Sequence, residues 1–593
     1  MRRLLVTCAL AATLGAVGVR STVAAAATPI PEGPGAASLP QFLGAPATPQ
    51  PVAASVPPQN PSLAANGSSN IHEDAYMTDA SARTGPLGRD MSRLSTFFGR
   101  ECASLTFDRA GRIVTVCVGL DRPVLELLDP RTLDTIASFD LPPRQPSVST
   151  SPFTDFSGGG YFYLDGADRA VVPTTDRHID VVADTGNALT LVRSYDLTAA
   201  VGAQDAITSA LPDWSGGIWF VSSKGVVGRV DPSTGAVHAI DTHELIGNSF
   251  AVDETGGVYV VTDAALYRFD TGPGGVPVVS WRQTYPNDGT TKPGQTEVGS
   301  GTTPTLMGPD LVSITDNADP IDIVVMRRAR TLPAGVPRVV CTQPVFDRGA
   351  SDSDNSLIAT DRSMVVENNY GYSGPSATEN GASTTGGLER VDVDPALDGC
   401  HPVWRSPERA PSVVAKLSRG SGLVYTYTKD PRSDGQDAWY LTALDFRTGA
   451  TRFKRLAGEG LGFNNNYAPV SIGPDGTAYV GVLGGLVALR DAVPPPQGLA
   501  PSLGMTPTRT TTKRRGRLRV HVRVRRTRRR CVIRLAGPDR HRVRRLVALV
   551  RRTHRIAADR RPPLRLSVRR RHRRVRVVAI ARDGRRARFR VRC

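Results

Sequence analysis

The stretch that decides the fold is residues 248–270, which read NSFAVDETGGVYVVTDAALYRFD. An apolar strand leads into a turn at residues 253–257, whose glycines allow positive φ, and a second and a third strand follow, the third ending in Asp270. The same pattern occurs eight times between Cys102 and Asp491, about 40 to 60 residues apart. One such sheet cannot bury both of its faces alone. The repeat therefore predicts an all-β protein, an eight-bladed β-propeller closed into a ring.

The repeat also predicts where the innermost strand of each blade begins. These starts lie near Cys102, Gly160, Ile207, Asn248, Thr303, Asn355, Pro411 and Tyr467. The last blade lacks an outer strand, because prolines 494–496 cannot take part in a paired strand. We expect residues 94–98 to supply that strand, so that the propeller spans residues 89–493 and is closed by its N-terminal segment.

The N-terminus has the features of an export signal. Arg2 and Arg3 precede an uncharged apolar run over residues 4–19, and alanines 24–27 offer small-residue cleavage sites. We expect residues 1–27 to be a signal peptide and the protein to be secreted, extracytoplasmic and associated with the cell wall. Residues 28–88 are rich in Pro and Ala and are expected to form an extended linker.

Six cysteines remain after the signal, an even number that indicates disulfides in an exported chain. Folding about the turn at residues 108–111 places Cys102 opposite Cys117, so we expect these two to be bonded. Two further pairings are expected. Cys341–Cys400 would join the outer strands of adjacent blades, and Cys531–Cys593 would close the C-terminal domain.

The basic residues are concentrated in the C-terminal part of the chain. Residues 498–593 hold 35 Lys/Arg and 3 Asp/Glu, a net charge of +32, whereas the whole chain carries +18. Apolar residues alternate with arginine around Val522 and around Phe589, which predicts strands with one solvated face. After a linker at 494–513 we expect a small basic β-sandwich at 514–593. Its charge would attract an anionic cell-wall polymer, polysaccharide or lipid surface. Without interleaved aromatic residues, we expect no specific nucleic-acid binding.

The two kinds of loop nearest the central channel are rich in amides and carboxylates. In a propeller, the loop entering each inner strand and the loop after each second strand open on the same face. The expected ligand-binding residues of this face are Asn248, Asn355, Asn368, Asn369, Asn465, Asn466 and Tyr467. Such residues also cap ordinary turns, which is the alternative interpretation. Asp316, Asn317, Asp319 and Glu367 are expected to hold Ca²⁺ or another divalent metal, because hard cations prefer oxygen ligands.

Several third strands end in Asp and continue through a Thr-Gly turn, as at residues 231–235 and 445–449. This "LDxxTG" turn resembles the repeat of the pyrroloquinoline-quinone (PQQ) propellers, which have eight blades. The resemblance spans most of residues 100–491 and implies the propeller fold. The resemblance also implies a quinoprotein oxidoreductase activity as an alternative function. The adjacent cysteine pair common in those dehydrogenases is absent from this sequence.

A second resemblance is to six-bladed lactonase propellers, which hold one divalent metal with Glu, Asn and Asp. It implies a metal-dependent lactonase or ester hydrolase at the propeller centre, although the blade count differs. The sequence has no Gly-x-Ser-x-Gly elbow, P-loop or dinucleotide fingerprint. We therefore expect a monomeric, non-enzymatic binding or scaffold protein, with the hydrolase and the quinoprotein as alternatives.

Overall fold

The computed structural model describes residues 24–145, 153, 155 and 157–497, together with seven strands between residues 521 and 592. The chain divides into two compact units, Met1–Pro501 and Ser502–Cys593. The expected signal peptide lies almost wholly outside the described residues, and so does most of the linker at 494–513. Among the described residues, no helix is long and apolar enough to cross a membrane.

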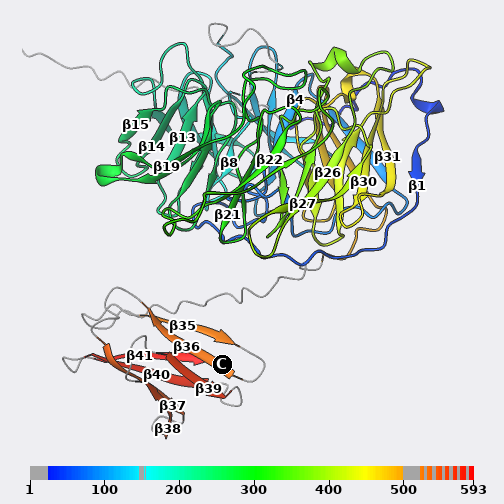
Figure 1. Cartoon of the computed structure of the whole chain (residues 1–593). Coiled ribbons are helices and arrows are strands. Elements are labelled where there is room, and N and C mark those ends of the chain that lie inside the picture. Colours follow the sequence, from blue (N-terminus) through cyan, green and yellow to red (C-terminus); the bar gives the residue numbers. More distant parts are fainter. Residues whose placement is uncertain are drawn as a thin grey trace, which may run out of the picture. The chain divides into compact units, whose positions relative to one another are not determined.

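The first unit contains eight four-stranded antiparallel blades in chain order (Figure 1). Blade 1 consists of β4 (Glu101–Phe107), β5 (Ile113–Val118), β6 (Val124–Leu128) and β7 (Thr135–Asp140). Blade 2 consists of β8 (Tyr163–Leu164), β9 (Ala170–Pro173), β10 (His178–Asp184) and β11 (Leu189–Asp196). Blade 3 consists of β12 (Ile207–Pro212), β13 (Ile218–Ser222), β14 (Val226–Val230) and β15 (Val237–Asp241). Blade 4 consists of β16 (Ala251–Val252), β17 (Val258–Val261), β18 (Ala265–Thr271) and β19 (Pro277–Thr284).

The remaining blades complete the ring. Blade 5 consists of β20 (Thr305–Met307), β21 (Leu311–Thr315), β22 (Asp322–Arg327) and β23 (Val339–Pro344). Blade 6 consists of β24 (Ile358–Ala359), β25 (Ser363–Glu367), β26 (Leu388–Val393) and β27 (Cys400–Ser406). Blade 7 consists of β28 (Lys416–Ser418), β29 (Leu423–Thr428), β30 (Ala438–Asp445) and β31 (Thr451–Glu459). Blade 8 consists of β32 (Val470–Ile472), β33 (Ala478–Val482), β34 (Gly485–Arg490) and β3 (Ser92–Phe97).

The N-terminal strand closes the ring, as the sequence predicts. β3 pairs antiparallel with β34, with Leu94 opposite Ala488. Blade 1 then lies against blade 8, since β4 contacts β33 and β34. The eight-bladed propeller is thereby confirmed.

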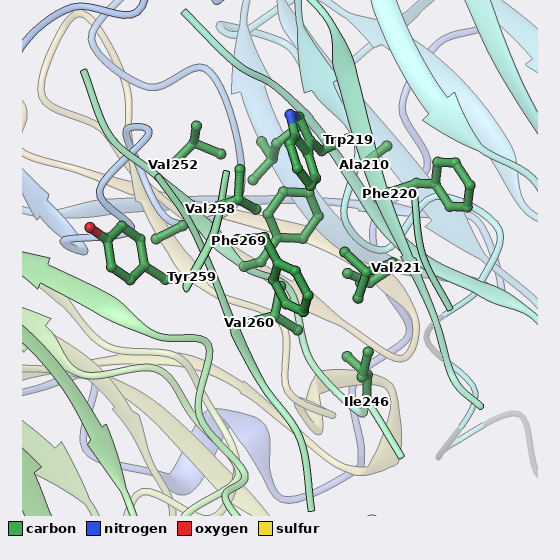
Figure 2. Packing of buried hydrophobic residues seen from close by; sticks show 14 of the residues in the cluster. Ala210, Trp219, Phe220, Val221, Ile246, Val252, Val258, Tyr259, Val260 and Phe269 are labelled. Carbon is green, nitrogen blue, oxygen red and sulfur yellow. The ribbon is translucent and has the colours of Figure 1, made fainter. Parts of the chain in front are cut away.

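Apolar second strands fill the space between neighbouring blades. In Figure 2, Trp219 and Val221 of β13 lie close to Val258 and Val260 of β17, with Phe269 of β18 beside them. All five side chains are buried. This packing is why the second strands read as continuous apolar runs rather than alternating ones.

Two of the expected disulfides join the predicted cysteines. Cys102 and Cys117 are bonded and lie opposite each other in the β4–β5 register. Cys341 of β23 is bonded to Cys400 of β27, which links the outer strands of blades 5 and 6. Cys531 is disulfide-bonded; its predicted partner Cys593 lies outside the described residues.

Residues 28–88 do not form the expected linker. The segment begins with the 3₁₀ turn η1 (Ala36–Ser38), and β1 (Phe42–Gly44) pairs with β31 at the outer edge of blade 7. Farther along, β2 (Ala80–Ser81) pairs in parallel with β28 at the inner edge of the same blade. In Figure 1 this blue segment runs along the lower face of the propeller. Short 3₁₀ turns also occur at η2 (Pro273–Gly275), η3 (Pro375–Thr378) and η4 (Leu461–Phe463).

Residues 60–83, which we call the hub segment, contact the inner strand of every blade. Seven backbone N–H groups of the blades donate to carbonyls of this segment, and they belong to Leu164, Gly166, Val252, Leu306, Ala359, Leu417 and Arg419. Side chains of the hub segment reach the other three blades by donating to the carbonyls of Phe107, Pro212 and Ile472. The physical reason is that each inner strand has an unpaired edge facing the channel, which offers backbone groups to any polar chain that can reach it.

The second unit is a two-sheet sandwich, as expected. One sheet contains β35 (His521–Arg526), β36 (Arg530–Ala536) and β39 (Arg565–Arg569). The other contains β38 (His554–Asp559), β37 (Val543–Val550), β40 (Arg574–Ala581) and β41 (Arg586–Arg592). Val522, Ile533, Leu546, Val577 and Phe589 belong to its common core.

Candidate functional site

The predicted entry loops do converge at the hub. A chamber of about 30 Å³ lies there, with Ile71 and His72 of the hub segment among its lining residues. The lining also includes these residues of the surrounding blades: Tyr161, Asn248, Asp354, Asn355, Ser356, Asn466 and Tyr467. Four of the seven expected ligand-binding residues therefore share one chamber, although they are far apart in the sequence.

The other three expected ligand-binding residues brace loops. Asn465 donates from Nδ2 to the carbonyls of Ala468 (2.9 Å) and Gly481 (2.8 Å). Asn368 accepts at Oδ1 from the backbone N–H groups of Asp352 and Tyr370. Asn369 accepts from the N–H of Asp354 at 2.8 Å and donates to the carbonyl of Pro411 at 3.2 Å. These amides satisfy backbone groups, as turn-capping residues do.

The expected metal-binding set is not brought together. Asp316 accepts from the backbone N–H groups of Ala318 and Asp322 within its own loop. Glu367, in the next blade, accepts from Thr426 at 2.5 Å and from Asn355 at 3.4 Å.

Asn317 and Asp319 also have local partners. Asn317 donates to the carbonyl of Thr290 at 2.8 Å, and Asp319 accepts from the N–H of Gly349 at 2.6 Å. Over the described part of the chain, no group of three His, Cys, Asp or Glu residues is placed to hold a metal ion. The prediction of this metal site is wrong, because each of the four side chains is hydrogen-bonded to other groups of the protein.

A buried charged cluster, which the sequence analysis missed, lies beneath the chamber. His72 Nδ1 is 2.9 Å from Asp79 Oδ2, and Lys416 Nζ donates to Asp79 Oδ1 at 2.5 Å and to the carbonyl of Ile71 at 3.1 Å. All three side chains are at most 2 % exposed. One signal was available: no proline occurs between Pro61 and Pro86, and charged residues appear there.

His72 also approaches two hydroxyl groups. Its Nε2 atom is 3.3 Å from both Ser356 Oγ and Thr303 Oγ1. With Asp79 this resembles the nucleophile, base and carboxylate order of hydrolases. The chamber beside Ser356 is small, about 30 Å³. His72 links the hub segment to blades 5 and 6 through these two hydroxyl groups.

Carboxyl groups around the hub are unusually easy to protonate. Burial raises the pKa of Asp352 to about 8, and the neighbouring Asp354 adds to the rise. Burial likewise raises the pKa of Asp354 and of Glu297 to about 7, and that of Glu101 and Glu367 to about 8. Both carboxylate oxygens of Asp352 lack a hydrogen-bond partner within the described residues. Near neutral pH, the folded protein therefore holds protons that the unfolded chain would release.

We expect the propeller to lose stability as pH rises from about 4 to about 8. An exposed Asp has a pKa near 3.9, so in this window the folded state binds more protons than the unfolded state. Each carboxyl with a raised pKa contributes a loss of up to about 1.4 kcal/mol per pH unit. Urea unfolding of D352N between pH 5 and pH 7.5 should show a slope shallower by about that amount. The control D398N, at an exposed turn, should keep the wild-type slope.

Comparisons with known proteins add little beyond the fold. No family model matches the chain. An uncharacterized protein of Archaeoglobus fulgidus is 29% identical over 313 residues, which cover 47% of this chain and 60% of the relative. The chain thus spans 60% of the length of that curated relative.

Solved structures with a related fold are remote in sequence. Streptogramin B lyase is 10% identical with a TM-score of 0.36, covering 68% of this chain and 97% of that one. PorZ, a bacterial surface component of the type-IX secretion system of Porphyromonas gingivalis, is 11% identical with a TM-score of 0.32, covering 83% and 59%. A chain of the mitotic checkpoint complex is 8% identical with a TM-score of 0.33, covering 59% and 92%.

Proposed function

We propose that this protein is an exported propeller scaffold, which its basic sandwich holds at an anionic cell-wall polymer, polysaccharide or lipid surface. The observation that carries the proposal is the placement of arginine on β41. This strand carries arginine at every second position, 586, 588, 590 and 592, and Arg590 is exposed whereas the neighbouring Phe589 is buried.

The strand register also places arginines of neighbouring strands opposite each other. Arg590 lies opposite Arg576, and Arg592 opposite Arg574, on β40. Like charges directly opposite each other destabilise a sheet. Successive arginines along one face of a strand are about 7 Å apart. A polymer with closely spaced anionic groups would offset this repulsion, which supports a polyanion as the partner.

The second sheet repeats the arrangement. Arg523 lies opposite Arg534, which in turn lies opposite Arg565. Arg523, Arg534 and Arg590 are exposed. Because arginines line both sheets, the sandwich offers an anionic surface more than one binding face.

Export and the scaffold role have separate support. The apolar run at residues 4–19 and the two disulfides within the propeller favour an oxidising compartment. The small size of the hub chamber favours a role in which the propeller presents its surfaces to partners rather than converting a substrate at its centre.

A quinoprotein oxidoreductase is a second candidate. Eight blades and the Asp-to-Gly turns at 231–235 and 445–449 support a relation to the PQQ-type propellers. Adding PQQ to the purified protein tests this candidate. A bound-quinone absorption band would favour it, and an unchanged PQQ spectrum would count against it.

We expect the full chain to bind inorganic polyphosphate with an affinity that falls steeply as salt rises. Replacing the four arginines of β41 with glutamine should weaken binding at least tenfold at 50 mM salt. The slope of log affinity against log salt should also fall by about three. The salt concentration that elutes the protein from isolated cell walls should fall in parallel.

A matched control removes four exposed or half-exposed propeller arginines instead. The control variant carries R131Q, R330Q, R348Q and R362Q. It should bind polyphosphate as the wild type does. Equal weakening in the two variants would mean that only net charge matters, and wild-type binding by the β41 variant would contradict the proposal.

A further inference from the structure

A cleft of about 530 Å³ lies beside the hub segment. It shares no lining residue with the chamber around Asn248. Asn66 and Arg83 of the hub segment line one side. The β4–β5 turn at residues 108–111, Asp168 of blade 2 and Pro474 of blade 8 line the other. Pockets of this volume hold ligands of sugar or drug size.

Arg83 brings a positive charge to the cleft, and the nearby carboxylates Glu73 and Asp475 favour that charge without forming an ion pair with it among the described residues. Its guanidinium donates to the carbonyl of Ile472 at 2.6 Å and to that of Asn66, and it lies 5.1 Å from the centre of the Phe107 ring. No carboxylate forms an ion pair with it within the described residues. Two carbonyls leave several of its five N–H donors available.

The other charged groups of the cleft are already paired. Asp108 accepts an ion pair from Arg112 at 2.6 Å, and Asp168 pairs with Arg109 at 3.4 Å. Among the described residues, Arg83 is therefore the charged lining group of the cleft that has no ion-pair partner. Burial lowers the pKa of Arg83, so ionisation there is costly and an anion in the cleft would favour the charged form.

We propose that this cleft binds a small organic anion of sugar size, a sugar acid or a sugar phosphate, with its carboxylate or phosphate on Arg83. A guanidinium presents parallel N–H groups that match two oxygens of one such anion. Gln59 and Asn66, which also line the cleft, are polar neighbours for the sugar hydroxyls. The site is separate from the arginines of the sandwich.

Hydrogen exchange of the full chain tests the proposal, because it distinguishes the cleft from anion binding by the sandwich. Glucuronate and glucose 6-phosphate are the two anionic probes, and glucose is the neutral one. We expect at least one anion to slow exchange in peptides covering residues 59–69 and 104–112, and glucose to leave them unchanged. Stronger protection by glucuronate would indicate a carboxylate site, and stronger protection by glucose 6-phosphate would indicate a phosphate site.

Three variants decide the outcome. R83Q should abolish the protection, but it also removes two contacts to carbonyls, so A110W serves as a second test. Ala110 is exposed at the cleft rim, and a tryptophan there would fill the cleft and leave Arg83 in place. A110W should weaken the anion at least tenfold with an unchanged melting temperature. The pair R523Q and R534Q should keep full protection.

Any of three results would overturn the proposal. The first is protection by neither anion, and the second is equal protection by glucose. The third is undiminished protection in a folded A110W variant.

Discussion

Replacing Asp79 with alanine is expected to lower the free energy of unfolding of the propeller by about 3–5 kcal/mol. The Asp79 carboxylate accepts from Lys416 Nζ at 2.5 Å, and both side chains are at most 1 % exposed. Removing the carboxylate leaves a buried ammonium that, among the described residues, donates only to the carbonyl of Ile71 and lies 3.7 Å from Glu73 Oε2. Urea or thermal unfolding measures the loss.

A matched control is the exposed pair of Asp434 with Arg432. D434A should cost less than about 1 kcal/mol, because exposed ion pairs contribute little. The double variant D79A/K416M should recover part of the loss, since it removes both buried charges. A loss below about 1 kcal/mol in D79A would show that the hub cluster does not hold the N-terminal segment.

The second large effect concerns ring closure. Replacing residues 89–100 by a Gly/Ser sequence of the same length should make the protein aggregate. The replacement removes β3, so the edge of β34 and the apolar residues beside it become available to other chains. Size-exclusion chromatography and light scattering report the outcome.

The control for that experiment is a Gly/Ser replacement of residues 330–336, in the loop between β22 and β23, most of which are exposed. This variant should stay monomeric. A soluble β3 variant that melts like the wild type would show that the ring does not need its N-terminal strand.

The sequence predicts the propeller well because its signals are local. Each blade carries its own turn residues and its own buried second strand, as in residues 253–261. The Cys102–Cys117 bond is also predicted, but the register beside the turn differs by one residue, with Ser104 opposite Val116, and a bulge at Ala103 brings the two cysteines opposite each other. Convergence of Asn248, Asn355 and Asn466 follows from topology alone, because entry loops share one face.

The hub segment could not be predicted in the same way. Residues 60–83 form almost no regular structure of their own, and their partners are up to 389 positions away in the chain. The metal prediction for Asp316 and Glu367 was wrong for a related reason. Composition places oxygen atoms on a face, whereas the direction of each side chain depends on its hydrogen-bond donor, which is the N–H of Asp322 for Asp316 and the Thr426 hydroxyl for Glu367.

The contacts of the hub segment also constrain how the molecule is made. Asn60, Asp79 and Arg83 are synthesised early. Their hydrogen-bond partners Pro212, Lys416 and Ile472 are synthesised much later. Such distant pairings give the chain a high contact order and slow folding. Docking of residues 60–83 can therefore be complete only after blade 8 has formed, because Arg83 donates to the carbonyl of Ile472 in that blade.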